Sequence, residues 1–124
     1  MTLNELKTAK QMLKNYDLLV DEVRKYDHKC DDIFGRLEKE GVNIATEEGQ
    51  KKAAAVLFAA GLTDENGCTA IYENLSKARV NLVNYIIDHI VGKMIPAQER
   101  EILHGANVSY QYKIIEAARK MLAA

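Results

Sequence analysis

The residues of this chain that could carry acid–base or metal chemistry are three histidines, two cysteines and the carboxylates near them. Glu101 and His104 have the Glu-x-x-His spacing that places two ligands on one helical face, as in carboxylate-bridged di-iron bundles. Such a centre needs two of these pairs and two further glutamates, and the sequence contains one pair. We therefore favour a surface pair near a helix end over a metal site.

A denser polar cluster surrounds His28. His28 and Asp32 lie one helical turn apart and could share a divalent cation with a residue from elsewhere in the chain. The same acidic stretch also lies opposite an apolar stripe, where a solvated face is expected. Cys30 falls on that stripe and is interpreted as a small buried apolar residue. We favour the solvated face and predict neither a metal nor a cofactor.

The remaining histidine, His89, lies beside Asp88 on the apolar stripe of a later helix. We interpret it as a buried histidine that is hydrogen-bonded to a neighbouring helix. Nucleophile motifs, glycine-rich phosphate loops and Cys-x-x-Cys pairs are absent from the sequence. The sequence therefore predicts no catalytic residues, no enzymatic activity and no small-molecule substrate.

The composition predicts a folded, mostly helical domain that holds such residues in place. The 124 residues are 48% hydrophobic and 28% charged with a single proline, which excludes disordered and low-complexity classes. A formal charge of -1 gives no global attraction to nucleic acid or membrane. An export signal and an apolar run of about 20 residues are both missing, so we predict a cytoplasmic protein with reduced cysteines and no membrane contact.

Hydrophobic periodicity predicts an all-α fold, a bundle of four to five helices in one domain over 1–124. The long N-terminal helix (1–40) begins with a capping box of Thr2 and Glu5. Its apolar stripe, which Asp27 interrupts, continues to about Glu40. A helix that is continuous over this length would be about 57 Å long. Either the helix breaks near Asp27 or Gly35, or the stripe packs against a second chain.

We favour association of two chains, because bare apolar stripes are rarely left in water. The predicted partner is therefore a second copy in a homodimer. The residues predicted to form its interface are Leu6, Leu13, Tyr16, Val20, Val23 and Phe34.

Two central helices are expected over 46–94. The first is capped by Thr46, is apolar on nearly all sides and therefore buried, and stops at Gly61. The second spans Cys68 to Met94.

The last segment, 96–124, is expected to hold a short helix over 98–104 and a final helix capped by Ser109. The final helix should turn apolar residues inward and three charged ones outward. The inward set is Tyr110, Ile114, Ile115, Ala118, Met121 and Leu122; the outward set is Lys113, Glu116 and Lys120.

The charge is not evenly distributed. From Cys68 onward the chain carries a formal +2, and the residues before it carry -3. The two C-terminal helices and the turn between them have the form of a helix-turn-helix, whose second helix would contact bases and phosphates. The residues predicted to contact DNA are Ser109, Tyr110, Gln111, Tyr112, Lys113, Arg119 and Lys120.

The segments 99–103 (Glu-Arg-Glu-Ile-Leu) and 108–112 (Val-Ser-Tyr-Gln-Tyr) follow a long charged N-terminal helix. Together they resemble small phage late-transcription regulators with a sigma-region-four-like end, although the family's further helix between these segments is absent. The resemblance implies a non-enzymatic regulator of phage or mobile-element origin that binds DNA or the transcription machinery through its C-terminal helices. The alternative is a helical protein–protein adaptor or inhibitor without nucleic-acid contact.

Overall fold

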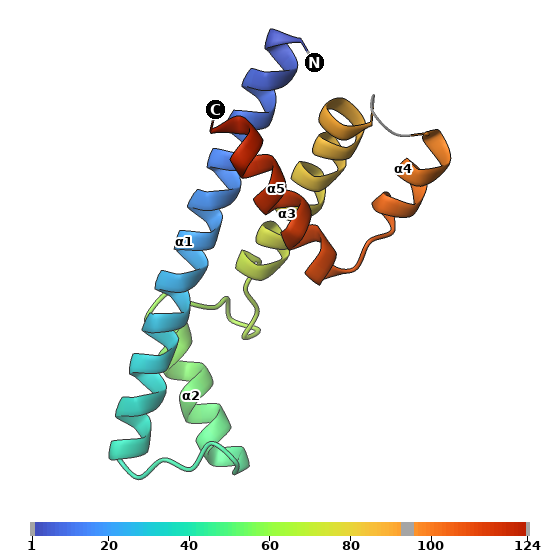
Figure 1. Cartoon of the computed structure of the whole chain (residues 1–124). Coiled ribbons are helices and arrows are strands. Elements are labelled where there is room, and N and C mark those ends of the chain that lie inside the picture. The colour runs from blue at the N-terminus through green and yellow to red at the C-terminus, as the bar shows by residue number, and fades with distance from the viewer. Residues whose placement is uncertain (1, 93–95, 124) are drawn as a thin grey trace. The chain divides into compact units, whose positions relative to one another are not determined.

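The computed structural model describes residues 2–92 and 96–123, and all regular structure within these ranges is helical. The elements are α1 (Leu3–Lys39), α2 (Glu47–Ala59), α3 (Ile71–Tyr85), the π-helix η1 (Ile86–Val91), α4 (Ala97–His104) and α5 (Val108–Leu122) (Figure 1). The predicted all-α fold and its long first helix are thus confirmed. Among the described residues, no helix is both long and apolar enough to cross a membrane.

Helix α1 is continuous through both positions where a break was considered, the Asp27 region and Gly35. Its 37 residues extend over about 55 Å at 1.5 Å per residue. The predicted capping box starts it: the Thr2 amide donates to Glu5 Oε1 (2.9 Å), and the Glu5 amide donates to Thr2 Oγ1 (3.1 Å). The N-terminal segment is therefore one unbroken helix from Leu3 to Lys39.

Helices α1 and α2 end in the same way, with a glycine in the left-handed region. Gly41 (φ 80°) follows α1, and Gly61 (φ 74°) follows α2, where the sequence predicted a stop. After α1 the Val42 amide donates to the Leu37 carbonyl, and after α2 the Leu62 amide donates to the Leu57 carbonyl, both at 3.0 Å. These are Schellman motifs, which satisfy terminal carbonyls and turn the chain sharply.

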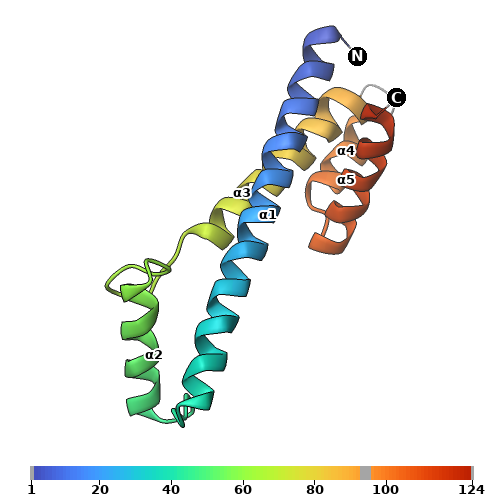
Figure 2. The same ribbon diagram turned by 90° about the vertical axis from the view of Figure 1, so that its left-hand side faces the viewer.

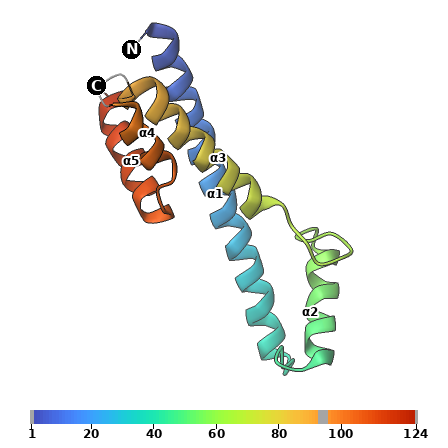
Figure 3. The same cartoon turned by 90° about the vertical axis from the view of Figure 1, so that its right-hand side faces the viewer.

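The contacts divide the chain into two units, and α1 contributes to both. The hairpin unit comprises residues 20–72, in which α2 runs antiparallel to the C-terminal half of α1 (Figures 2 and 3). Its core consists of Ile33, Leu37 and Ala53, against which partly buried side chains pack. These flanking residues are Phe34, Val42, Val56, Leu57 and Leu62.

The expectation that α2 is buried on nearly all sides was wrong. Only Gly49 and Ala53 of this helix are buried, and Phe58 is exposed. A helix with one helical neighbour in its unit covers one face only, so its alanine-rich remainder stays in solvent. The predicted cap is correct, because Thr46 Oγ1 accepts from the Gly49 amide at 3.0 Å.

The terminal unit comprises the described residues of 2–19 and 73–123. It holds the larger share of the buried side chains, from α1, α3, η1 and α5. They are Ala9, Tyr16, Leu82, Val83, Ile86, Ile87, Ile90, Ile115, Ala118 and Leu122. Helices α4 and α5 both pack against η1, which is the centre of this unit.

The predicted helix over 68–94 differs from the observed one at its start and in its last turns. Asp64 holds Cys68 in a turn, since the Cys68 amide donates to Asp64 Oδ1 (2.8 Å), and α3 begins only at Ile71. After Tyr85 the helix widens into η1, which buries Ile86, Ile87 and Ile90. The predicted end at Met94 lies outside the described residues. The π-helical turn was not foreseen from the sequence.

Candidate functional site

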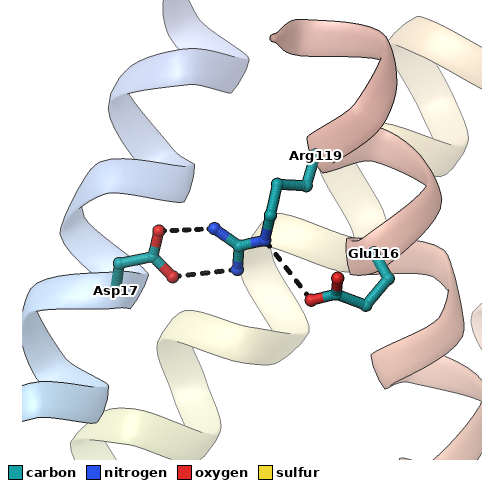
Figure 4. A network of polar contacts seen from close by, with 3 residues as sticks. All are labelled: Asp17, Glu116 and Arg119. Atoms are coloured by element: carbon teal, nitrogen blue, oxygen red, sulfur yellow. Dashed lines mark hydrogen bonds and ion pairs between the residues drawn. The ribbon is translucent and has the colours of Figure 1, made fainter.

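Arg119, a predicted DNA contact, is engaged within the chain (Figure 4). Its Nη1 and Nη2 donate to the two carboxylate oxygens of Asp17 at 2.7 and 3.0 Å, and its Nε donates to Glu116 at 3.3 Å. The hydrogen bond to Asp17 raises the pKa of the guanidinium above its usual value. Two carboxylates therefore neutralise this cation, and it fixes α5 to α1 inside the terminal unit.

Gln111 and Tyr112, two further predicted DNA contacts, face Arg79 of α3. The Arg79 Nε donates to Gln111 Oε1 at 3.0 Å, and its guanidinium carbon lies 5.7 Å from the centre of the Tyr112 ring. Gln111 also donates to the Ala106 carbonyl at 3.3 Å. A cation over an aromatic face is favourable, so these contacts hold the start of α5 on α3.

The remaining predicted contacts, Ser109, Tyr110, Lys113 and Lys120, are exposed. Ser109 does not cap α5 as predicted. The cap is Asn107, whose Oδ1 accepts from the Tyr110 amide at 2.9 Å, and Ser109 lies one residue inside the helix. The extended backbone of Asn107 (ψ 169°) supplies the geometry that an N-cap requires.

The outward face of α5 is a depression of about 530 Å³. Tyr112, Ala117 and Met121 supply its apolar lining, and Lys113, Lys120 and Glu116 supply its charged lining. Of these three, Glu116 is paired with Arg119. We call this surface the α5 strip. Met121 and Tyr110 were predicted to point inward, but they are 49% and 46% exposed. The buried face of α5 is narrower than predicted and consists of Ile115, Ala118 and Leu122.

Of the candidate metal ligands, Glu101, His28 and Asp32 are exposed, and His104 pairs with Asp88. His104 Nε2 lies 2.8 Å from Asp88 Oδ1, and His89 Nδ1 lies 3.0 Å from Glu5 Oε2. His89 thus bonds to a neighbouring helix as predicted, but its side chain is 46% exposed rather than buried. Across residues 2–92 and 96–123, no three His, Cys, Asp or Glu side chains gather in a way that could hold a metal ion.

The residues predicted for self-association lie on α1 and are only partly available to a partner. Tyr16 is buried in the terminal unit, and burial raises the pKa of its phenol. The other five are half-buried: Leu6, Leu13, Val20, Val23 and Phe34. Cys30, predicted to be buried on the same stripe, is also half-buried. Packing inside the chain therefore uses much of this stripe.

Asp27, the polar residue in that stripe, accepts a hydrogen bond from the Tyr72 hydroxyl within the hairpin unit. The rings of Tyr72 and Tyr26 pack edge to face, with their centroids 5.8 Å apart. The Tyr26 hydroxyl donates to the Leu62 carbonyl at 2.9 Å. The two tyrosines thus fasten the chain after α2 back onto α1. A partner 45 residues away explains the polar position in the stripe.

The pKa of the Tyr72 phenol should be about 12, above its usual 10.0, because its hydroxyl donates a hydrogen bond to Asp27, whose charge also repels the phenolate. The raised pKa means that this bond stabilises the hairpin unit below pH 10 and is lost as the pH rises towards 12. An ultraviolet titration checks this, and Asp27→Asn should return the pKa towards 10.0. A Tyr72 pKa that Asp27→Asn leaves unchanged would contradict the assignment.

A second apolar surface lies in the hairpin unit, where two adjoining depressions of about 520 and 300 Å³ share Phe34 and Ile44. Ala54 and Leu57 of α2 line one side, and Asp31 and Glu38 of α1 line the other. We call these six residues the hairpin groove. Only Phe34 among them was predicted from the sequence to lie at an interface, because a groove between α1 and α2 depends on how the hairpin closes.

The structure thus offers two apolar surfaces with charged edges, one basic on α5 and one acidic on the hairpin. The polar pairs around η1, by contrast, connect helices to one another. No family model, no curated protein and no solved structure matches this chain.

Proposed function

We propose that this chain is a small non-enzymatic regulatory protein that acts by binding another protein through the α5 strip. The observation that carries the proposal is the double engagement of Arg119 by Asp17 and Glu116. With that guanidinium paired to Asp17 and Glu116, α5 presents an apolar lining beside two lysines rather than a continuous cationic surface. Apolar surface with a charged rim is the usual form of a protein interface.

The same observation weakens the case for DNA. Of the three C-terminal cations predicted to touch DNA, only Lys113 and Lys120 have no ion pair among the described residues. Non-specific affinity for duplex DNA comes almost entirely from the lysines and arginines that neutralise phosphates, so it falls as their number falls. Two lysines beside an apolar lining suit a protein partner better.

The chemistry of the α5 strip also defines the partner. Lys113 and Lys120 are seven residues apart, which is two helical turns, so both ammonium groups lie on one side of the strip. Glu116 lies between them on that side, where Arg119 is its partner. The complementary partner is a helix or helical groove with an apolar centre and two carboxylates at the same spacing. Charged rims of this kind add orientation and specificity to the apolar contact.

A designed peptide tests the proposal. The probe is a fluorescent amphipathic helix whose leucine and alanine stripe is flanked by two glutamates seven residues apart. We expect this peptide to bind the wild-type chain and to bind K113E/K120E at least about tenfold more weakly, because two attractive contacts become repulsive. The matched control is K7E/K14E, since Lys7 and Lys14 are exposed on α1 with the same spacing.

DNA binding, the competing hypothesis, is measured in parallel with a labelled DNA duplex at low salt. Loss of peptide binding in K113E/K120E but not in K7E/K14E, with no duplex retention, supports the proposal. Duplex retention that K113E/K120E abolishes, together with no binding of the glutamate peptide, would overturn it in favour of DNA.

A further inference from the structure

Four charged residues at the edges of the two apolar surfaces have no ion pair among the described residues. Lys113 and Lys120 line the α5 strip, and Asp31 and Glu38 line the hairpin groove. The remaining charged residue of the strip, Glu116, is paired with Arg119. The two surfaces therefore have opposite charge. This local contrast agrees with the formal +2 from Cys68 onward and the -3 before it.

The spacing of these charges also matches. Asp31 and Glu38 are seven residues apart on α1, as Lys113 and Lys120 are on α5, which is about 10.5 Å along either axis. Both surfaces lie on straight helical segments, so two charge pairs can form at once when the helices lie side by side. Two simultaneous contacts at fixed spacing set the register of such a pair.

A small residue stands at the same place in each set. Gly35 follows Asp31 by four residues, and Ala117 follows Lys113 by four. Gly35 is exposed, and a Cβ at its position would meet nothing within 4 Å. Small side chains at this point leave room for two helices to approach closely between the charge pairs.

The hairpin groove also has apolar surface left to cover. Its unit has a core of only three buried side chains, and Phe34 and Leu57 are only partly buried against it. Ile44 is exposed at the rim of the groove, as Tyr112 and Met121 are in the α5 strip. Contact between the two surfaces would remove all of these from water, which is the main favourable term in association.

We propose that the acidic partner of the α5 strip is the hairpin groove of a second copy of this chain. The inference rests on the proposed function and names its partner. Because strip and groove are different surfaces, the contact is heterologous: each copy that docks its strip still offers a free groove. Such a contact builds a ring or an open chain rather than a dimer through two equivalent patches.

Sedimentation velocity of the full chain tests this with two charge-reversal variants. Wild type should associate in a concentration-dependent way, and K113E/K120E and D31K/E38K should each sediment as a 13.9 kDa monomer. A mixture of the two variants should associate again, because the unchanged strip of D31K/E38K meets the unchanged groove of K113E/K120E. K7E/K14E has the same change of net charge as K113E/K120E and should associate like wild type. Circular dichroism verifies that each variant keeps its helices.

Association that returns only on mixing is the result that supports the inference. It is overturned if wild type remains a monomer, or if K113E/K120E still associates, as a dimer through the apolar stripe of α1 would. The glutamate-peptide experiment tests the proposed function independently of self-association. A monomeric wild type that binds the peptide refutes the self-association and leaves the proposed function standing, whereas failure of the peptide refutes the proposed function.

Discussion

Replacing Leu82 with alanine is expected to lower the free energy of unfolding by about 2–5 kcal/mol, because the truncated side chain leaves a cavity that its neighbours fill only in part. Leu82 is 0% exposed in α3, within the core of the terminal unit. Urea denaturation followed by circular dichroism measures the loss. The proposed binding surface lies on the outer face of α5, so the effect reports on packing alone.

The matched control for this prediction is Leu18→Ala, which removes the same atoms from a side chain that is 55% exposed on α1. Exposed substitutions of this kind change stability by about 0.5 kcal/mol or less. Equal losses for Leu82→Ala and Leu18→Ala would contradict the assignment of Leu82 to the core.

Local signals in the sequence were sufficient for the fold class and for most helix ends. A capping box, an N-cap threonine and a glycine after α2 act over a few residues, and the structure confirms Thr2, Thr46 and Gly61 in those roles. The prediction of Ser109 as the cap was wrong because two nearby residues, Asn107 and Ser109, both have side chains that suit a cap. The backbone is extended at Asn107, whereas Ser109 lies inside the helix. Local sequence rules therefore identify the few residues that can cap a helix, but not which of them does so.

The candidate site was less predictable, because its properties depend on partners far apart in the chain. Asp17, one of the two carboxylates that neutralise Arg119, is 102 positions away from it in the chain. Tyr72, which donates the hydrogen bond to Asp27, is 45 positions away from Asp27. Helical periodicity shows that a side chain faces one side of its helix, but not which element covers that side. Met121 was therefore expected inside, whereas it lines the α5 strip.

Replacing Gly49 with alanine should destabilise the hairpin unit by about 1–3 kcal/mol, the usual cost of forcing atoms into a filled site. A Cβ at Gly49 would lie 1.8 Å from the Asn43 carbonyl oxygen, so the turn that leads into α2 must shift. That shift would also disturb the cap, because the Gly49 amide donates to Thr46 Oγ1. Chemical denaturation with a probe in the hairpin unit measures the change.

Gly35→Ala is the matched control, since it adds the same methyl group to a helix of the same unit. At Gly35 the new Cβ would meet nothing within 4 Å, and alanine is favoured over glycine in a helix interior by about 1 kcal/mol. Gly49→Ala should therefore destabilise the hairpin unit, and Gly35→Ala should stabilise it. If both changed stability in the same direction, helix propensity or a general intolerance of α1 and α2 would explain the data better than the close contact at Asn43. Opposite signs would show that Gly49 is required by the turn beside it, and that the space at Gly35 is free in the isolated chain, as docking of a second helix requires.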